Sequence, residues 1–272
     1  VCENLQIDIK DCERVLTERT KAIMPVHLFG FTPNMDEVMA FAEHHNLLVM
    51  EDSAQGLGIK WKEKGCGSFG HAAAFSFFAD KTLTTGEGGF VTTNDYAVYE
   101  KLLYLRNQGR QGRGTFIHPE IGYNFRMTDI QCAIGLAQLK KFDSLVEKKN
   151  KIHEKYTELF ADFDKVEIYQ PPEEVSPFIP FRVILRTKND EAELLMKYMR
   201  QNEVEPRMFF YPLHLQPVFR TSIDEPRYDR KHFSVAEKAY NNGVCLPSFV
   251  AITEEQIEYV HDVIRGFYET YR

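Results

Sequence analysis

Three polar side chains stand at or just after apolar segments typical of strands, where a sheet could present them to a ligand. Asp52 follows the apolar run 47–50, Ser76 interrupts the run 72–78, and Lys81 comes a few residues later. Ligands of open α/β sheets bind beyond the carboxyl ends of the strands. Each residue also has an ordinary alternative: an N-cap or ion-pair carboxylate, a core hydroxyl, or a solvated lysine.

Lys81 has the most reactive side chain of the three. An amine becomes a nucleophile or a general base when desolvation or a nearby cation lowers its pKa. Residues 82–89 after it are rich in threonine and glycine, and glycine lets a backbone approach a ligand closely. This cluster is neither a phosphate-binding loop, because no Gly-Lys-Ser/Thr follows, nor a GxGxxG turn. It therefore argues against both modes of nucleotide binding and against a nicotinamide-dependent oxidoreductase.

Composition narrows the class of protein. The chain has 272 residues, of which 43% are hydrophobic and 27% are charged, as in globular domains. The net charge of −7 without a basic stripe predicts no nucleic-acid partner. Five scattered cysteines without a CxxC pair predict no disulfide framework and no metal site, and fit a reducing cytoplasm. No apolar run is long enough for a membrane span and no signal peptide is visible, so we expect a cytoplasmic location and no membrane contact.

Strand-like and helix-like segments alternate over the first 110 residues, which predicts an α/β fold with a largely parallel sheet. The expected strands are 21–29, 47–50, 72–78 and 89–93, and the expected helices are 35–45 and 96–106, the latter capped by Asp95. Helices 129–141 and 142–160 follow, then strands 166–169 and 181–185 and helices 191–201 and 254–268. We predict a large domain over residues 1–149 and a smaller α+β domain over residues 150–272.

Longer segments of the chain resemble the DegT/DnrJ/EryC1/StrS family of sugar aminotransferases. These enzymes depend on pyridoxal phosphate (PLP) and have the aspartate aminotransferase-like fold. Within the family the chain is most similar to the perosamine synthetases, which aminate C4 of GDP-4-keto-6-deoxymannose, although relatives that use dTDP- or UDP-linked keto sugars share most of the same residues. The similarity runs along essentially the whole chain and rests on ordered motifs at residues 23–30, 51–55, 67–70, 75–89, 122–131, 207–214 and 246–249.

The resemblance implies a role in cofactor binding for five residues. Lys81 would carry PLP covalently and move a proton as general base and acid. Asp52 would pair with the pyridine nitrogen, and Gln55 would lie against the ring or its hydroxyl. Ser76 would bind the cofactor phosphate. Asn124 would reach the phosphate in the neighbouring subunit, unless it is an ordinary turn asparagine, so the family pattern implies a homodimer with shared active sites.

The resemblance also implies substrates and the residues that contact them. An amino group would pass from L-glutamate to C4 of a nucleotide-linked 4-keto-6-deoxy sugar, as in O-antigen biosynthesis. Arg126 would bind the donor carboxylate or the sugar phosphates, or hold the helix that follows it. Tyr211 and His214 would contact the sugar or form a buried polar network. His27, at a strand end, is expected to be structural.

The chain opens at Val1 without a methionine and enters strand and helix patterns at once. We therefore expect it to be the C-terminal part of a longer polypeptide. In the family, the preceding part supplies the first strands of the large domain and a helix N-terminus for the cofactor phosphate. A truncated or non-catalytic PLP-fold scaffold protein is the alternative. The presence of Lys81 argues against it, and against a sugar dehydratase, in which histidine replaces this lysine.

Overall fold

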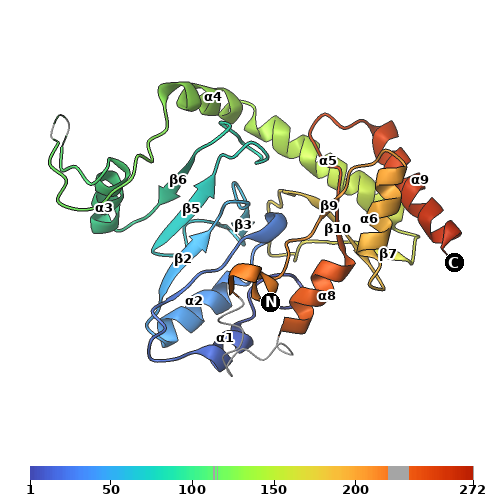
Figure 1. The fold of residues 1–272 in the computed structure, drawn as a ribbon, viewed down its shortest axis with the longest axis horizontal. Coiled ribbons are helices and arrows are strands. Elements are labelled where there is room, and N and C mark those ends of the chain that lie inside the picture. The colour runs from blue at the N-terminus through green and yellow to red at the C-terminus, as the bar shows by residue number, and fades with distance from the viewer. Residues whose placement is uncertain (113, 115, 220–232, 272) are drawn as a thin grey trace.

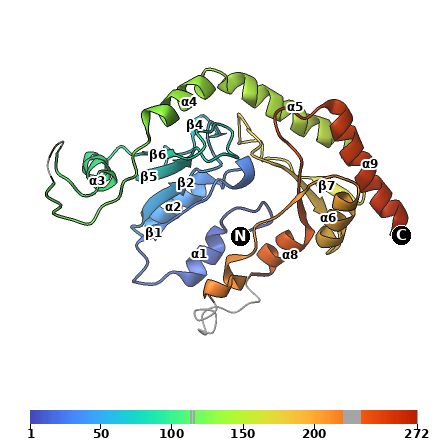
Figure 2. The same cartoon turned by 45° about the horizontal axis from the view of Figure 1, so that its top comes forward.

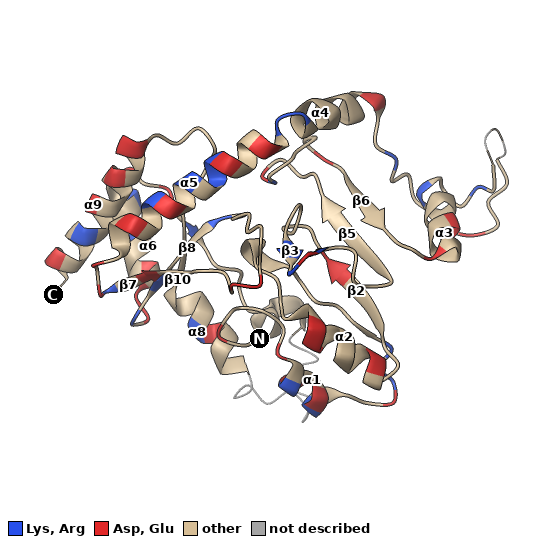
Figure 3. Cartoon of the chain, turned by 180° about the vertical axis from the view of Figure 1, so that it is seen from behind, with Lys and Arg blue, Asp and Glu red and all other residues tan. Residues whose placement is uncertain are grey.

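The computed structural model describes all residues except 113, 115, 220–232 and 272. The described residues contain two four-stranded sheets, one from each half of the chain, and a two-stranded hairpin. The long helix α5 (Phe142–Phe160) runs from the first sheet to the second (Figures 1 and 2). Acidic and basic side chains are interspersed along it and along α9 (Glu254–Thr270) (Figure 3). Within this described part, no helix has the length and apolar character needed to cross a membrane.

The first sheet has the strand order β1-β2-β5-β6. Its strands β1, β2 and β5 are parallel, and β6 pairs with β5 in the antiparallel sense. This agrees with the prediction of a largely parallel sheet. The strands are β1 (Ala22–Ile23), β2 (Leu48–Asp52), β5 (Ala72–Ser76) and β6 (Gly89–Thr92).

Helix α2 (Met35–His44) covers one face of this sheet. It begins where the Asn34 side chain accepts hydrogen bonds from the backbone of Asp36 and Glu37, which satisfies amide groups that lack a partner within the helix. Its buried face packs with Ile23 and Val49 in a single apolar cluster. The remaining elements of this half are α1 (Ile9–Val15), β3 (Lys60–Trp61), β4 (Lys64–Gly65), α3 (Tyr96–Arg106, capped by Asp95) and α4 (Asp129–Leu139).

The strand expected over residues 21–29 is much shorter in the structure. Only β1 forms a ladder, and Val26 makes a single isolated bridge to Asp52. Pro25 has no N–H to donate to a ladder, which explains the interruption. The chain then turns through the 3₁₀ helix η1 (Leu28–Gly30), in which Phe29 has a φ of 59°.

The second sheet is antiparallel throughout, in the order β7-β8-β10-β9. One face packs against α5, α6 and α9. The other face contributes Phe181, Ile184 and Cys245 to a cluster that also holds Phe29 and Phe31 from the first half of the chain. The elements are β7 (Val166–Ile168), β8 (Val183–Thr187), α6 (Ala192–Gln201), β9 (Arg207–Met208), η2 (Leu213–Leu215), η3 (Pro217–Phe219), α8 (Ser234–Asn242), β10 (Gly243–Leu246) and α9. The domain boundary at residue 149 stays a prediction.

A buried carboxylate fixes the end of β2. Glu51, only 2% exposed, accepts hydrogen bonds from His27 Nε2 at 2.9 Å and from the backbone N–H of Gly67, Phe69 and Gly70 at 2.7, 2.7 and 2.8 Å. Burial opposes ionisation, but the His27 and backbone hydrogen bonds outweigh it and hold the pKa of Glu51 below its ordinary value.

This network holds the turn 67–70 and the segment around His27 against β2. Gly67 has a φ of 86°, and a Cβ there would lie 2.2 Å from the ring of Phe75, so the tight turn depends on glycine. The residue after Glu51 is Asp52, whose backbone pairs with Pro25 and His27. The strand end that carries Asp52 is therefore fixed from two sides.

Candidate active site

Lys81 lies at a cavity of about 650 Å³ between the two halves of the chain. Its Nζ is 4.8 Å from the ring centre of Phe181. Phe181 lies just before strand β8 of the second sheet. The walls include Phe29, Gln55 and Phe78 from the first half and Phe181, Arg182 and Tyr211 from the second. The site is therefore assembled from segments far apart in the sequence.

The surroundings of Lys81 favour its neutral amine. Desolvation by burial is the largest cause that lowers its pKa, and the positive charge of Arg182 lowers it further. The negative charges of Asp80 and Asp52 oppose both effects without cancelling them. A lysine with a lowered pKa in a cavity is a candidate nucleophile or general base.

Asp52 lies at the carboxyl end of β2, close enough to Lys81 to act on its pKa. Its Oδ1 accepts a hydrogen bond of 3.0 Å from the backbone of Ala54. Its other carboxylate oxygen has no hydrogen-bond partner among the residues that the structure describes. The structure thus leaves one oxygen of a rigidly held carboxylate available to a cationic group.

Gln55 and Ser76 differ in their relation to the cavity. Gln55 lines it and accepts a hydrogen bond of 2.6 Å from the backbone of Phe29 through Oε1, which leaves the amide nitrogen available. Ser76 is the last residue of β5, and its Oγ accepts a bond of 3.2 Å from the backbone of Phe78. Ser76 is not part of the cavity wall.

Asn124 and Arg126 lie away from Lys81 within this chain. Arg126 donates to Asn124 Oδ1 and to Asn107 Oδ1, both at 2.9 Å. Both residues border a separate hollow of about 1140 Å³ between α3, the segment 123–127 and the strands β5 and β6. Helix α3 and the segment that follows it project from the rest of the molecule (Figure 1).

Of the two predicted sugar contacts, Tyr211 lies at the cavity and His214 does not. Tyr211 packs edge-on against Tyr240. His214 stacks on Phe233 with ring centres 4.3 Å apart and pairs through Nε2 with Glu237 at 2.7 Å. The contact with Glu237 thus favours the interpretation of His214 as part of a polar network.

Sequence reasoning missed three residues around Lys81: Phe181, Arg182 and Lys149. Lys149, 8% exposed, donates to the carbonyl oxygens of Pro180 and Phe181 at 3.0 and 3.2 Å. Arg182 Nη2 lies 2.7 Å from Asp80 Oδ2. The sequence could have indicated that Lys149 is buried, because its spacing places it on the same face of α5 as Ile152, His153, Tyr156 and Phe160.

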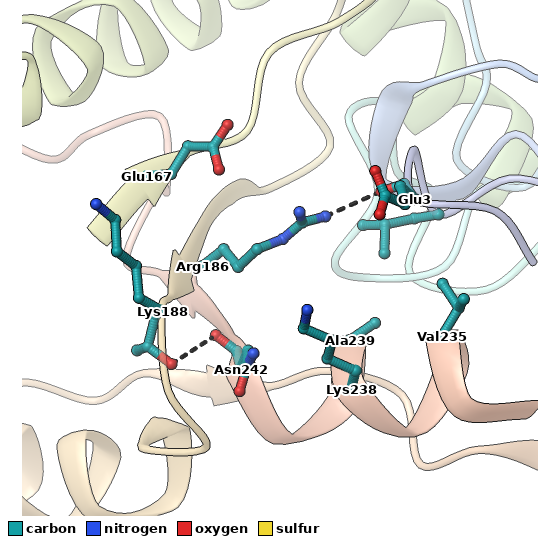
Figure 4. A pocket seen from close by; sticks show the side chains of 10 residues that line it. Glu3, Glu167, Arg186, Lys188, Val235, Lys238, Ala239 and Asn242 are labelled. Atoms are coloured by element: carbon teal, nitrogen blue, oxygen red, sulfur yellow. Dashed lines mark hydrogen bonds between the residues drawn. The ribbon is translucent and has the colours of Figure 1, made fainter. Parts of the chain in front are cut away.

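A smaller cavity of about 240 Å³ lies elsewhere, between the first residues of the chain and the second sheet (Figure 4). There Arg186 donates to the Glu3 carbonyl at 2.9 Å, and Glu167, Lys188 and Lys238 are among the lining residues. It contains none of the predicted site residues. Across the described residues, no group of three or more His, Cys, Asp and Glu side chains is arranged to hold a metal ion.

Comparison with known proteins identifies the family of this chain. The sequence profile of the DegT/DnrJ/EryC1/StrS aminotransferase family matches residues 2–265. The GDP-perosamine synthase of Escherichia coli O157:H7 is 37% identical over 266 residues, which are 98% of this chain and 71% of that protein. The GDP-perosamine synthase of Caulobacter vibrioides is 35% identical over 260 residues, 93% of this chain and 68% of that protein. The solved structure of Helicobacter pylori PseC, an aminotransferase involved in the biosynthesis of pseudoaminic acid, matches with a TM-score of 0.89 at 25% identity, covering 99% of this chain and 72% of PseC.

Lys149 makes the stability of the protein depend on pH in a predictable direction. Burial, assisted by the charge of Arg182, lowers the pKa of Lys149 to about 8. Between that pH and the ordinary lysine pKa the unfolded chain binds more protons than the folded one, so the free energy of unfolding rises with pH. Relative to a Lys149→Met variant, the wild type should gain about 2–3 kcal/mol between pH 7 and pH 10.

Urea unfolding of both proteins at the two pH values measures this gain. Lys148→Met is the matched control, because Lys148 is an exposed lysine on the same helix. A stability difference between wild type and Lys149→Met that does not change with pH would contradict the account.

Proposed function

Because the chain belongs to the DegT/DnrJ/EryC1/StrS aminotransferase family of PLP-dependent sugar aminotransferases, we propose that it transfers the amino group of L-glutamate to C4 of a nucleotide-linked 4-keto-6-deoxy sugar. The two GDP-perosamine synthases among its relatives support GDP-4-keto-6-deoxymannose as the acceptor. The observation that carries the proposal is the Lys81 amine, which has a lowered pKa, lies in a cavity and is close to a carboxylate.

The groups around Lys81 fit PLP chemically. They offer an amine for the aldehyde, a carboxylate oxygen that accepts no hydrogen bond from the described residues for a protonated ring nitrogen, and an amide nitrogen. The cavity volume also falls within the usual range of about 300–1,000 Å³ for small-molecule sites. When bound, PLP supplies an electron sink that stabilises negative charge on the carbon bearing the transferred nitrogen.

Four residues would hold the cofactor and move the proton. Lys81 would carry the cofactor and, when released by an incoming amine, would transfer the proton as general base and acid. Its lowered pKa suits this task, since an amine must be neutral to accept a proton. Asp52 would keep the ring nitrogen protonated, Gln55 would lie against the ring, and Ser76 would hold the phosphate.

Substrate binding would involve both halves of the chain. Tyr211, in the cavity wall, would contact the sugar, and His214 would contact it or hold that wall through Glu237. Arg126 would bind a carboxylate or phosphate, and Asn124 would reach the cofactor phosphate of a second subunit. Asn124 and Arg126 border a hollow that does not include Lys81 of the same chain, which supports a homodimer with shared sites.

The acceptor is tested with a panel of 4-keto-6-deoxy sugars linked to GDP, dTDP or UDP, with L-glutamate as the donor. We expect the highest kcat/KM with GDP-4-keto-6-deoxymannose. Lys81→Ala should abolish nitrogen transfer to any of them, because it removes the amine proposed to carry the cofactor and the proton. Lys197→Ala, which removes an exposed lysine of α6, should leave transfer unchanged. Transfer by Lys81→Ala at the wild-type rate would refute the proposed role, and a preference for a UDP sugar would refute the acceptor.

The shared sites are tested by mixing two inactive variants. A dimer of one Lys81→Ala chain and one Asn124→Ala chain has one intact site and one doubly altered site. Random reassociation should therefore restore about a quarter of the wild-type activity, measured after the two variants are dissociated and reassembled together. Activity no greater than that of the separate variants would show that Asn124 does not serve a neighbouring subunit.

A further inference from the structure

A three-residue segment of the second half, 180–182, contacts the surroundings of Lys81. The Phe181 ring centre lies 4.8 Å from Lys81 Nζ and 4.9 Å from the Arg182 guanidinium. Lys149, on α5, holds the carbonyl groups of Pro180 and Phe181. These residues are far from Lys81 in the sequence. The segment therefore reaches Lys81 only because the two halves of the chain pack against each other.

The strongest contact of this segment is an ion pair with the residue that precedes Lys81. Arg182 Nη2 lies 2.7 Å from Asp80 Oδ2, and the two side chains are only 20% and 33% exposed. A half-buried pair is less screened by water than a surface pair. One oxygen of the Asp80 carboxylate is therefore held by Arg182.

We propose that Arg182 is a positioning residue for the Lys81 amine: it engages Asp80 and so weakens the stabilisation of the Lys81 ammonium by this carboxylate, while Lys149 keeps the segment 180–182 in place. The inference rests on the proposed role of Lys81 as the cofactor lysine. It adds that the second half of the chain, and not only the sheet that carries Lys81, sets the protonation of that amine.

The charges that face Lys81 come from several elements. Asp52 comes from β2 and Asp80 from the loop after β5; both favour the ammonium form, whereas Arg182 disfavours it. The cavities beside Lys81 are also lined by Glu205, Arg207 and Lys149. Replacing Arg182 removes a cation and also releases Asp80, and both changes favour the ammonium form. Replacing Asp80 removes an anion and acts in the opposite direction.

The contact also links Lys81 to the placement of the two halves. Asp80 and Lys81 belong to the loop after β5, whereas Arg182 immediately precedes β8 and Lys149 belongs to α5. Any displacement that separates Arg182 from Asp80 would make Lys81 more basic. The amine would therefore be reactive only while the two halves are in contact.

The experiment measures the protonation of Lys81 without cofactor or sugar. The cofactor-free protein is treated with a trace of acetic anhydride at a series of pH values, and acetylation of the Lys81 peptide is quantified by mass spectrometry. Only the neutral amine reacts, so the midpoint of the profile reports the pKa of Lys81. Arg182→Gln should move this midpoint to higher pH and slow acetylation several-fold at pH 8. Asp80→Asn should move it to lower pH.

Two further variants separate positioning from general loosening of the fold. Lys149→Met should shift the midpoint in the same direction as Arg182→Gln and add little to it in the double variant, because both act through one segment. Arg265→Gln, which removes an exposed arginine of α9, should have no effect. Damage to the fold alone would not move two variants in opposite directions.

The inference is overturned if Arg182→Gln leaves the midpoint unchanged or lowers it, or if Arg182→Gln and Asp80→Asn shift it in the same direction. Should Arg182→Gln fail to fold, the nearly isosteric Asp80→Asn still decides, since a midpoint that does not fall would contradict the inference. Because the readout needs neither cofactor nor sugar, a failure here is distinct from a failure to aminate a nucleotide sugar.

Discussion

The contact between Phe181 and Lys81 joins the two halves of this protein at the proposed site of its chemistry. A lysine on a loop beside a single sheet would be solvated, charged and unreactive. The antiparallel sheet of the second half places an aromatic ring near the amine and a guanidinium on the neighbouring carboxylate, which together remove water and compensate negative charge. The apolar cluster that holds Phe29, Phe181 and Cys245 packs the two halves against each other. The burial of this apolar cluster thus fixes the electrostatic environment of Lys81.

A second constraint acts at the carboxyl end of β2, near Lys81. The carboxylate of Glu51 is buried and satisfied by an imidazole and three backbone N–H groups. Removing one partner from such a buried arrangement typically costs about 3–5 kcal/mol, so the end of β2 is rigid. Because Asp52 is the next residue, its backbone is held rigidly too, and one of its carboxylate oxygens remains available to accept a hydrogen bond. The two neighbouring acids therefore differ: Glu51 is buried and stabilises the fold, whereas Asp52 is only partly buried and is proposed to bind the cofactor.

The elements that the sequence predicted well are those with strong local signals. The apolar face of α2 and the Asp95 cap of α3 depend on residues within a few positions of each other. The length of β1 was predicted wrongly, because the apolar pattern outweighed the effect of Pro25. The strands β9 and β10 were missed, since β10 pairs with β8 and β9 pairs with β10, each across a long stretch of chain. Among the site residues, Asp52, Gln55 and Lys81 followed from motifs, whereas the Asp80–Arg182 pair spans 102 positions and leaves no local pattern.

The central claim is that Lys81 is the amine that carries PLP, and Lys149 is its natural competitor. Lys149 is also a lysine with a lowered pKa, and both residues line the same neighbouring cavity. Incubation with PLP, reduction with borohydride and peptide mass mapping would identify the lysine that is attached to the cofactor. The account predicts that the cofactor mass is found on the peptide containing Lys81 and not on the peptide containing Lys149. A label on Lys149, or one spread over exposed lysines, would contradict it.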